Sequence, residues 1–265
     1  MNDTLEPAIL SQLQSLLGSE HVLTDRESRE FYSTDVYAAG RLPLAVVRPA
    51  STADVAQLVQ LCASRGVALV ARGGGASYTD GYTPAEANSI VVDTSRMNEI
   101  LELNERDMYV VAQVGVTWAT LNEMLAAKGL RTPFFGPFSG ITATVGGSLS
   151  QNSVTWGTGV FGVSGESTLG VEAVLGTGEI VRTGSWGAAN STPFMRSYGP
   201  DLTGLFMGDC GAFGVKTAVA LRLMPRNAHV MGLSFGFPDF ASMARGLEAD
   251  RKSTRLNSSH TDISR

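Results

Sequence analysis

A run of glycines directly behind an arginine is the part of this sequence best suited to binding chemistry. Residues 72–81 read Arg-Gly-Gly-Gly-Ala-Ser-Tyr-Thr-Asp-Gly. Glycine admits positive φ and lets a ligand approach the main chain, so successive N–H groups can converge on an anion. The planar guanidinium of Arg72 could donate two hydrogen bonds to phosphate oxygens. The segment therefore predicts a phosphate-binding loop, with a flexible surface turn as the alternative.

The elements that precede this loop favour phosphate binding. Residues 44–48 and 67–70 are short apolar, valine-rich runs, typical of strands. Between them, Ser51 and Thr52 are N-cap candidates for a helix with apolar residues at 3.6-residue spacing, and Gly66 ends it. The loop then leaves the C-terminal end of a strand, which is where layered α/β units usually bind ligands.

Two more glycine-rich segments follow. Residues 136–152 combine small residues, hydroxyls and a Gly-Gly pair, which permit close approach of a planar ligand and uncharged hydrogen bonds to it. Residues 208–214 contain three glycines and lead into a predicted strand at 215–224. Three such turns suggest one ligand held by several backbone loops. A literal GxGxxG at 157–162 is not interpreted as a dinucleotide motif, because a polar segment precedes it and poor helix formers follow.

The remaining patterns predict a mixed fold. Further predicted elements are strands at 89–93 and 108–114, a helix at 117–128 and a hairpin over 169–182. The chain has 265 residues, 43% of them apolar and 17% charged, with 30 glycines, so we expect a globular protein rich in loops. It has no apolar run of the roughly 20 residues that span a membrane and no signal-peptide pattern, which predicts a cytoplasmic protein without a transmembrane segment.

Charge and residue spacing exclude several classes of function. A net charge of −5 argues against a nucleic-acid surface, which needs clustered Lys and Arg. The two cysteines and three histidines have no ligand-like spacing, so no metal site is predicted. The sequence contains no Walker-type GxxxxGK, which removes the best support for a nucleotide triphosphatase, and its one literal GxSxG, at 232–236, is not interpreted as a nucleophile elbow.

The order of the motifs carries a family resemblance. Arg72-Gly-Gly-Gly is followed by Thr142-Ala-Thr-Val-Gly-Gly, then by Leu169-Gly-Val-Glu-Ala-Val-Leu, then by Gly211-x-x-Gly-Val. Together they resemble the FAD-binding domain of the vanillyl-alcohol-oxidase / p-cresol methylhydroxylase (PCMH) superfamily. Within it they are most similar to the FAD-linked oxidases that include D-lactate dehydrogenases and the glycolate oxidase D subunit. The resemblance covers residues 42–225.

The resemblance implies an α+β fold in which a two-subdomain, PCMH-type FAD-binding domain spans residues 42–226, behind an N-terminal helical lead-in at 1–41. It also implies that the FAD diphosphate lies on the first loop and that the other two segments line the flavin. The implied cofactor-binding residues are Arg72, Gly73, Gly74, Gly75, Ala76, Ser77, Tyr78, Thr79, Pro137, Thr144, Gly146, Gly147, Ser150, Asn152, Gly211, Gly214 and Val215. Members that bind FAD covalently carry histidine where this chain has Ala76, so a non-covalent flavin is expected.

The C-terminal part resembles the start of a second domain. In the family a ferredoxin-like cap covers the flavin and supplies most substrate-binding groups. Residues 227–250 resemble its first strand, at 230–238, and its first helix, at 240–249, so the cap is expected to be truncated. Residues 251–265 change in composition and are predicted to be a non-native or disordered tail.

The resemblance implies an FAD-dependent oxidoreductase that takes hydride from a small 2-hydroxy acid or alcohol. The electron acceptor is unknown, and no catalytic residue is assigned. Two alternatives stay open: a non-catalytic flavin-binding subunit that needs a partner subunit, and an NADPH-using reductase with the same type of FAD domain, similar to UDP-N-acetylenolpyruvoylglucosamine reductase. Reduction of the flavin by NADPH or by a hydroxy acid would separate the two enzyme hypotheses.

Overall fold

The structure is a computed structural model that describes residues 5–155, 157–229, 231 and 234–261. The chain divides into two compact units, Met1–Arg226 and Asn227–Arg265. The boundary falls at the residue where the sequence predicted the FAD-binding domain to end. Each unit is described by itself below.

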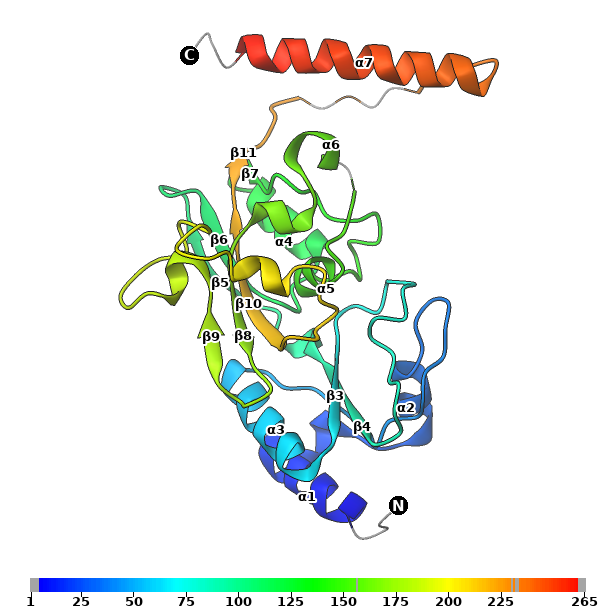
Figure 1. Cartoon of the computed structure of the whole chain (residues 1–265), viewed down its shortest axis with the longest axis vertical. Coiled ribbons are helices and arrows are strands. Elements are labelled where there is room, and N and C mark those ends of the chain that lie inside the picture. Colours follow the sequence, from blue (N-terminus) through cyan, green and yellow to red (C-terminus); the bar gives the residue numbers. More distant parts are fainter. Residues whose placement is uncertain (1–4, 156, 230, 232–233, 262–265) are drawn as a thin grey trace. The chain divides into compact units, whose positions relative to one another are not determined.

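The first unit begins with a four-stranded sheet flanked by helices (Figure 1). Its strand order is β1-β2-β4-β3, with β2, β4 and β3 parallel and β1 antiparallel to β2. The strands are β1 (Val22–Leu23), β2 (Ala45–Val47), β3 (Ala68–Arg72) and β4 (Ser89–Asp93), and the helices are α1 (Leu5–Leu17), α2 (Arg26–Tyr32) and α3 (Thr52–Arg65). The predicted strand, helix, strand and glycine loop are therefore present as β2, α3, β3 and the loop after Arg72.

Helix α3 shows why the local sequence predicts this unit. The Ser51 hydroxyl accepts a hydrogen bond from the Asp54 amide, and the Asp54 carboxylate accepts one from the Ser51 amide, which forms a capping box. Gly66 ends the helix at φ +62°, in the left-handed region that favours glycine. Its apolar face is buried, so both the ends and the face of the helix follow from the sequence.

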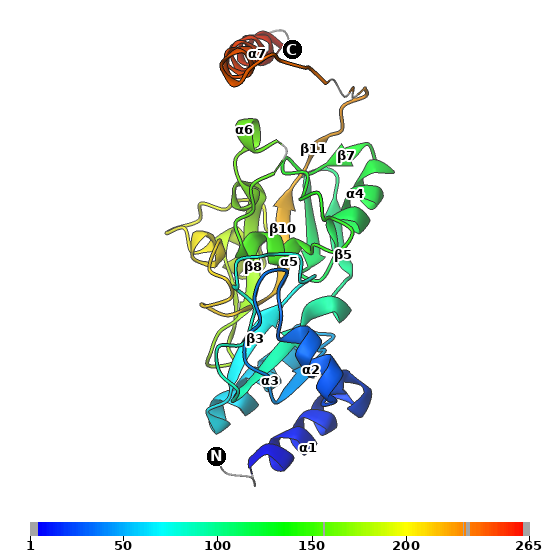
Figure 2. The same ribbon diagram turned by 90° about the vertical axis from the view of Figure 1, so that its right-hand side faces the viewer.

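A five-stranded antiparallel sheet forms the other half of the first unit, with the order β5-β6-β10-β8-β9 (Figure 2). Its strands are β5 (Ile100–Asn104), β6 (Tyr109–Gln113), β8 (Thr168–Val174), β9 (Ile180–Arg182) and β10 (Val215–Arg222). The associated helices are α4 (Trp118–Ala126), α5 (Val145–Ser150) and α6 (Thr158–Phe161), and β7 (Leu130–Arg131) pairs with β11 (Met224–Pro225). Short 3-10 turns lie at Ser19–His21, Thr94–Arg96, Ser164–Ser167, Gly184–Gly187 and Thr203–Phe206.

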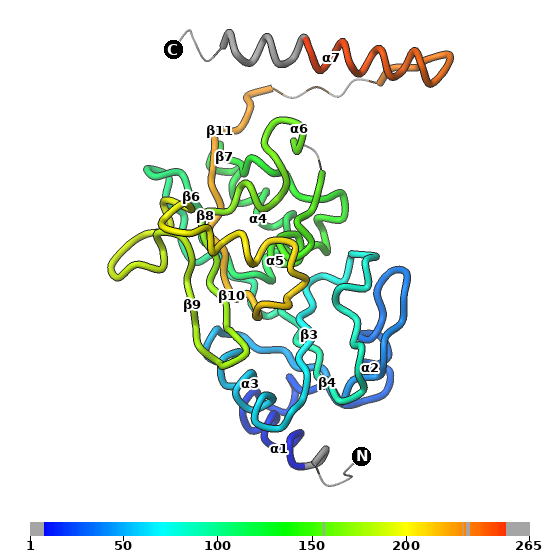
Figure 3. Tube along the Cα trace, in the orientation of Figure 1, coloured from blue at the N-terminus to red at the C-terminus, as the bar shows by residue number. Residues whose placement is uncertain are grey.

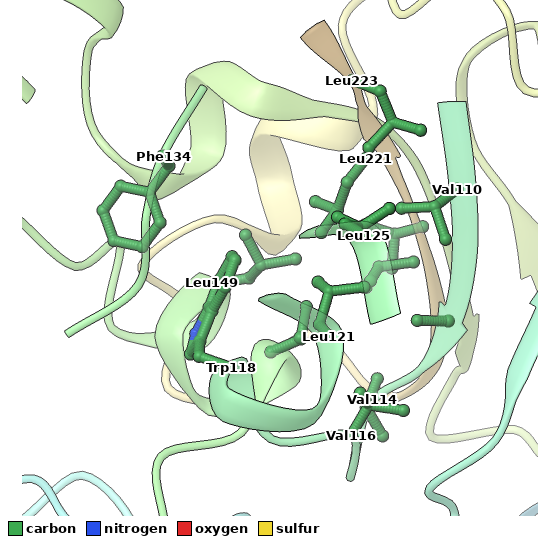
Figure 4. Packing of buried hydrophobic residues seen from close by; sticks show 14 of the residues in the cluster. Val110, Val114, Val116, Trp118, Leu121, Leu125, Phe134, Leu149, Leu221 and Leu223 are labelled. Atoms are coloured by element: carbon green, nitrogen blue, oxygen red, sulfur yellow. The ribbon is translucent and has the colours of Figure 1, made fainter. Parts of the chain in front are cut away.

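Each half has its own hydrophobic core. In the five-stranded half, Trp118, Leu121 and Leu125 of α4 pack with Leu149 of α5 against Leu221 of β10 (Figure 4). The four-stranded half has a separate cluster under α1 and α3. A third, smaller cluster joins the halves: it contains Val55 and Val59 of α3, Met97, Val174 of β8 and Val215 of β10. The first unit is thus an α+β fold of two subdomains, as the resemblance implied.

Helix α1 packs into the core of the four-stranded half, more closely than the predicted lead-in implied. Helices α1 and α2 lie within the predicted 1–41 segment, but Ile9 and Leu13 of α1 are 2% and 0% exposed and belong to the core of the four-stranded half. Strand β5 was not predicted, because its exposed and half-buried residues include Glu102 and Asn104 among the apolar ones.

The second unit contains, among its described residues, the single helix α7 (Phe240–Thr261). It includes the predicted helix at 240–249 and continues to Thr261. That residues 251–265 are a non-native or disordered tail stays a prediction. The strand predicted over 230–238 lies partly outside the described residues, and Ser234–Pro238 form no strand (Figure 3). The assignment of residues 227–250 to a cap domain stays a prediction.

Candidate functional site

The three glycine-rich segments meet at one cavity of about 380 Å³ in the first unit. The end of β3 and the loop after it contribute residues between 71 and 82, the segment around α5 contributes residues between 137 and 154, and the turn before β10 contributes residues between 210 and 216. The loop after β3 therefore faces the five-stranded half of the first unit, and the cavity lies where the two halves join.

Most of the sequence-predicted site residues lie on this cavity. The lining includes Arg72, Gly73, Gly74, Gly75, Ala76, Ser77, Tyr78, Thr79, Pro137, Thr144, Gly146, Gly147, Ser150, Gly211 and Gly214. Two predicted residues are elsewhere. The side-chain oxygen of Asn152 accepts a hydrogen bond from the Gly165 amide, and Val215 is buried in the cluster that joins the halves. Both lie next to cavity-lining residues in the sequence but serve the packing behind the cavity.

Two glycines of the first loop are needed for contact between the loops. A Cβ on Gly73 would lie 2.3 Å from the Thr144 hydroxyl, and one on Gly74 would lie 1.7 Å from the Thr142 carbonyl oxygen. Gly75 has φ +63°. The structure thus gives these glycines a packing role in addition to the ligand approach that the sequence suggested.

The backbone amides of the first loop have no hydrogen-bond partner among the residues that the structure describes. No acceptor in that part of the chain faces the N–H groups from Gly73 to Thr79, although Tyr82 and Val36 both donate to the Ser77 carbonyl. Residues Gly73 to Thr79 are exposed or half-buried, so their amides are open to solvent or to a ligand. Seven successive donors of this kind beside a cavity fit a ligand rich in acceptor oxygens, such as a diphosphate.

The Arg72 side chain is anchored behind the first loop, and its role in phosphate binding stays a prediction. Its side chain is 6% exposed, and Nη1 donates to the Thr34 carbonyl over 2.6 Å. The guanidinium carbon lies 4.7 Å from the Tyr82 ring centroid and 5.3 Å from that of Tyr32. Burial lowers the pKa of Arg72. The residue therefore supports the loop from behind, where a Cβ on Gly75 would meet its guanidinium at 2.5 Å.

Side chains tie the three segments together at the cavity wall. The Thr79 hydroxyl donates to Gln151 Oε1 over 2.8 Å, and Gln151 Nε2 lies 3.6 Å from Cys210 Sγ. Thr144 caps α5 by accepting a hydrogen bond from the Gly147 amide. These contacts fix the position of the first loop relative to α5 and to the turn before β10.

Lys216 is a cavity residue that the sequence analysis missed. It lies on β10 and is 5% exposed, and its Nζ donates to Ser150 Oγ over 2.9 Å and to Asp209 Oδ1 over 2.5 Å. Burial lowers the pKa of Lys216, and the Asp209 carboxylate offsets part of that effect. The available signal was its position in a strand segment, Val215–Leu221, that is otherwise free of charge and entirely buried.

The chemistry of the cavity lining is that of an anion site. Among the described lining residues the only charged side chains are Arg72 and Lys216, both cationic, in a chain whose net charge is −5. The side chain of Ala76 offers no nucleophile. Among the described residues no group of three or more His, Cys, Asp or Glu side chains could hold a metal ion. None of the described helices is long and apolar enough to cross a bilayer.

Comparison with known proteins identifies the fold and the cofactor. Residues 43–184 match the FAD binding domain family. The chain is 33% identical over 233 residues to an uncharacterised FAD-linked oxidoreductase of Mycobacterium tuberculosis, with 87% of this chain and 49% of that protein covered. It is 30% identical to glycolate oxidase subunit GlcD of Bacillus subtilis (82% and 45% covered) and to D-2-hydroxyglutarate dehydrogenase of Stutzerimonas stutzeri (92% and 51%).

A solved structure of p-cresol methylhydroxylase with bound substrate has the same fold. Its TM-score is 0.75 at 21% identity, with 86% of this chain and 45% of that chain covered. The chain spans about half the length of the curated relatives it matches. Since the matched family covers more than half of the chain and includes the loop after β3, this protein belongs to the FAD binding domain family of FAD-linked oxidoreductases, and FAD is its cofactor.

Proposed function

We propose that the cavity binds FAD non-covalently, with the diphosphate held by the backbone amides of Gly73 to Thr79. The row of donors without partners among the described residues is the observation that carries this proposal, and the cationic lining supports it. Ala76 supports non-covalent binding because it has no atom that could bond the flavin. When bound, FAD accepts hydride; the protein contributes binding, orientation and the local electrostatic field.

We further propose that the whole protein oxidises a small 2-hydroxy acid or a related alcohol. Two relatives are named for such substrates, glycolate and D-2-hydroxyglutarate. Because the chain covers only about half of each, the activity is proposed for the whole protein and no residue is assigned as the catalytic base.

The visible absorption spectrum of the purified protein tests the cofactor proposal. Flavin absorbance that moves into the supernatant after acid precipitation is expected for non-covalent FAD. Flavin that stays with the precipitate contradicts the non-covalent part, and a colourless protein that takes up no added FAD contradicts the site.

Anaerobic reduction tests the substrate class. Bleaching of the flavin by D-lactate, glycolate or D-2-hydroxyglutarate is expected, with no bleaching by NADPH. Bleaching by NADPH alone would support the reductase alternative. Tight flavin binding without reduction by any of these compounds would support the non-catalytic alternative.

A further inference from the structure

Lys216 has donor capacity that its contacts with the described residues do not use. An ammonium group carries three N–H donors, and Nζ makes two hydrogen bonds, to Ser150 Oγ and to Asp209 Oδ1. Lys216 also lines the cavity, and its Nζ lies 6.0 Å from the centroid of the Phe206 ring. The other cation of the lining, Arg72, directs Nη1 to the Thr34 carbonyl and packs against aromatic rings, while its Nε and Nη2 make no hydrogen bond to the described residues.

The Lys216–Asp209 ion pair is costly to bury. The two side chains are 4% and 1% exposed, and Asp209 Oδ2 has no hydrogen-bond partner among the described residues. Removing both charges from water costs several kcal/mol per ion in general, and buried pairs often give no net stability. An incompletely satisfied pair in a cavity wall is therefore better explained by ligand binding than by folding.

The charge of the cofactor identifies what this donor meets. Oxidised flavin is neutral, whereas the diphosphate of FAD carries the negative charge, and an ammonium binds phosphate oxygens as a point charge. Ser150, which Lys216 contacts, lines the same cavity as the first glycine loop, so a diphosphate that reaches Lys216 also passes Ser150, which the resemblance placed beside the flavin.

We infer that Lys216 is a cofactor-binding residue that donates a charge-assisted hydrogen bond to the FAD diphosphate. Asp209 is a positioning residue, since it holds the ammonium without lining the cavity. This inference rests on the proposed FAD site and adds to it a residue outside the glycine loops.

The test measures FAD and riboflavin affinity by fluorescence quenching on apoprotein of the full chain. For Lys216→Met we expect FAD binding about ten- to a hundredfold weaker, because a charge-assisted hydrogen bond is lost, and riboflavin binding nearly unchanged. Lys128→Met is the matched control: Lys128 is exposed, pairs with Glu105 at the surface and is absent from the lining, and its substitution should leave both affinities unchanged.

A second variant tests the inference if Lys216→Met fails to fold. Lys216→Met alone leaves Asp209 as an unpaired buried charge, which is strongly destabilising in general. The double variant Lys216→Met with Asp209→Asn removes both charges and keeps similar volumes, and it should fold and show the same loss of FAD affinity.

The outcomes separate this inference from the proposed site. Wild-type affinity for FAD in the folded double variant overturns the inference while the site stands. An equal loss of FAD and riboflavin affinity overturns the diphosphate assignment. Wild-type protein that binds no FAD overturns the site itself.

Discussion

At the scale of the residue, a substitution of Arg72 distinguishes a residue that stabilises the first loop from one that binds the ligand. Arg72→Met removes a charged hydrogen bond to the Thr34 carbonyl and the stacking on Tyr82. We expect the free energy of unfolding of the apoprotein to fall by about 2–3 kcal/mol. Chemical denaturation without FAD measures this. Arg26→Met, at an arginine whose side chain is 82% exposed, should change stability little.

The opposite result for Arg72→Met would support the hypothesis that the Arg72 guanidinium binds the phosphate oxygens. If Arg72→Met left the apoprotein as stable as wild type but weakened FAD binding, the guanidinium would have to leave the Thr34 carbonyl when the cofactor binds.

Tyr32, which stacks on Arg72, gives a prediction for pH dependence. Burial raises the pKa of Tyr32 to about 12, and its hydrogen bond to Asp93 adds to the effect. The usual tyrosine pKa is about 10, so the folded state favours the neutral phenol. This contribution to stability is complete below about pH 10 and is lost as the pH rises through about 12.

The measurement is thermal unfolding of wild type and Tyr32→Phe across this pH window. The phenylalanine ring keeps the stacking on Arg72 but does not titrate. The difference in stability between the two proteins should shrink as the pH rises through the window. A constant difference would show that Tyr32 does not ionise with the predicted shift.

At the scale of the element, the contact between the first glycine loop and the segment before α5 decides whether the cavity forms. A Cβ on Gly74 would overlap the Thr142 carbonyl oxygen, so Gly74→Ala must push these two segments apart. We expect FAD binding to be lost while the far-ultraviolet circular dichroism stays that of the wild type.

A matched control for Gly74→Ala lies in the glycine motif that the sequence analysis rejected. A Cβ added at Gly159 would meet no described atom within 4 Å, and Gly159 lies outside the cavity lining, so Gly159→Ala should bind FAD normally. Normal FAD binding by Gly74→Ala would show that the two segments need not touch for the cofactor to bind.

Helices and strands could be predicted where the sequence features that define them lie within the element itself. Helix α3 has a capping box, an apolar face and a glycine stop within sixteen residues, Ser51 to Gly66, and the structure has the predicted boundaries. Side-chain direction was not predictable in the same way. Motif order placed Val215 and Asn152 near the cavity, but the strand turns Val215 into the core and Asn152 bonds the Gly165 amide.

The roles of Arg72 and Lys216 depended on distant parts of the chain. Arg72 bonds a carbonyl 38 residues away, and Lys216 bonds a hydroxyl 66 residues away. Each of these two side chains bonds a residue that is distant in the sequence and close only in the folded protein. The sequence predicted that Arg72 and the glycines gather at one site, but not that Lys216 lines the same cavity.

At the scale of the whole molecule, the lining of the cavity belongs to one compact unit. Every residue of the cavity lining lies between Ala71 and Lys216, and the hydrophobic clusters of the described residues end at Leu223. In the second unit, large apolar side chains such as Phe235, Phe240 and Leu247 are exposed. The first unit therefore holds the whole cavity lining and hydrophobic cores of its own.

We expect a chain ending at Arg226 to fold and to bind FAD with the affinity of the full chain. FAD at a hundred times its dissociation constant should stabilise both chains by about 2.7 kcal/mol, measured as the shift in thermal unfolding. A chain ending at Asp209 lacks the central strand β10 and should not fold. If the chain ending at Arg226 folds but loses FAD, residues 227–265 contribute to the site directly. Equal affinity instead means that these residues can act only after the cofactor is bound, on substrate or on a partner.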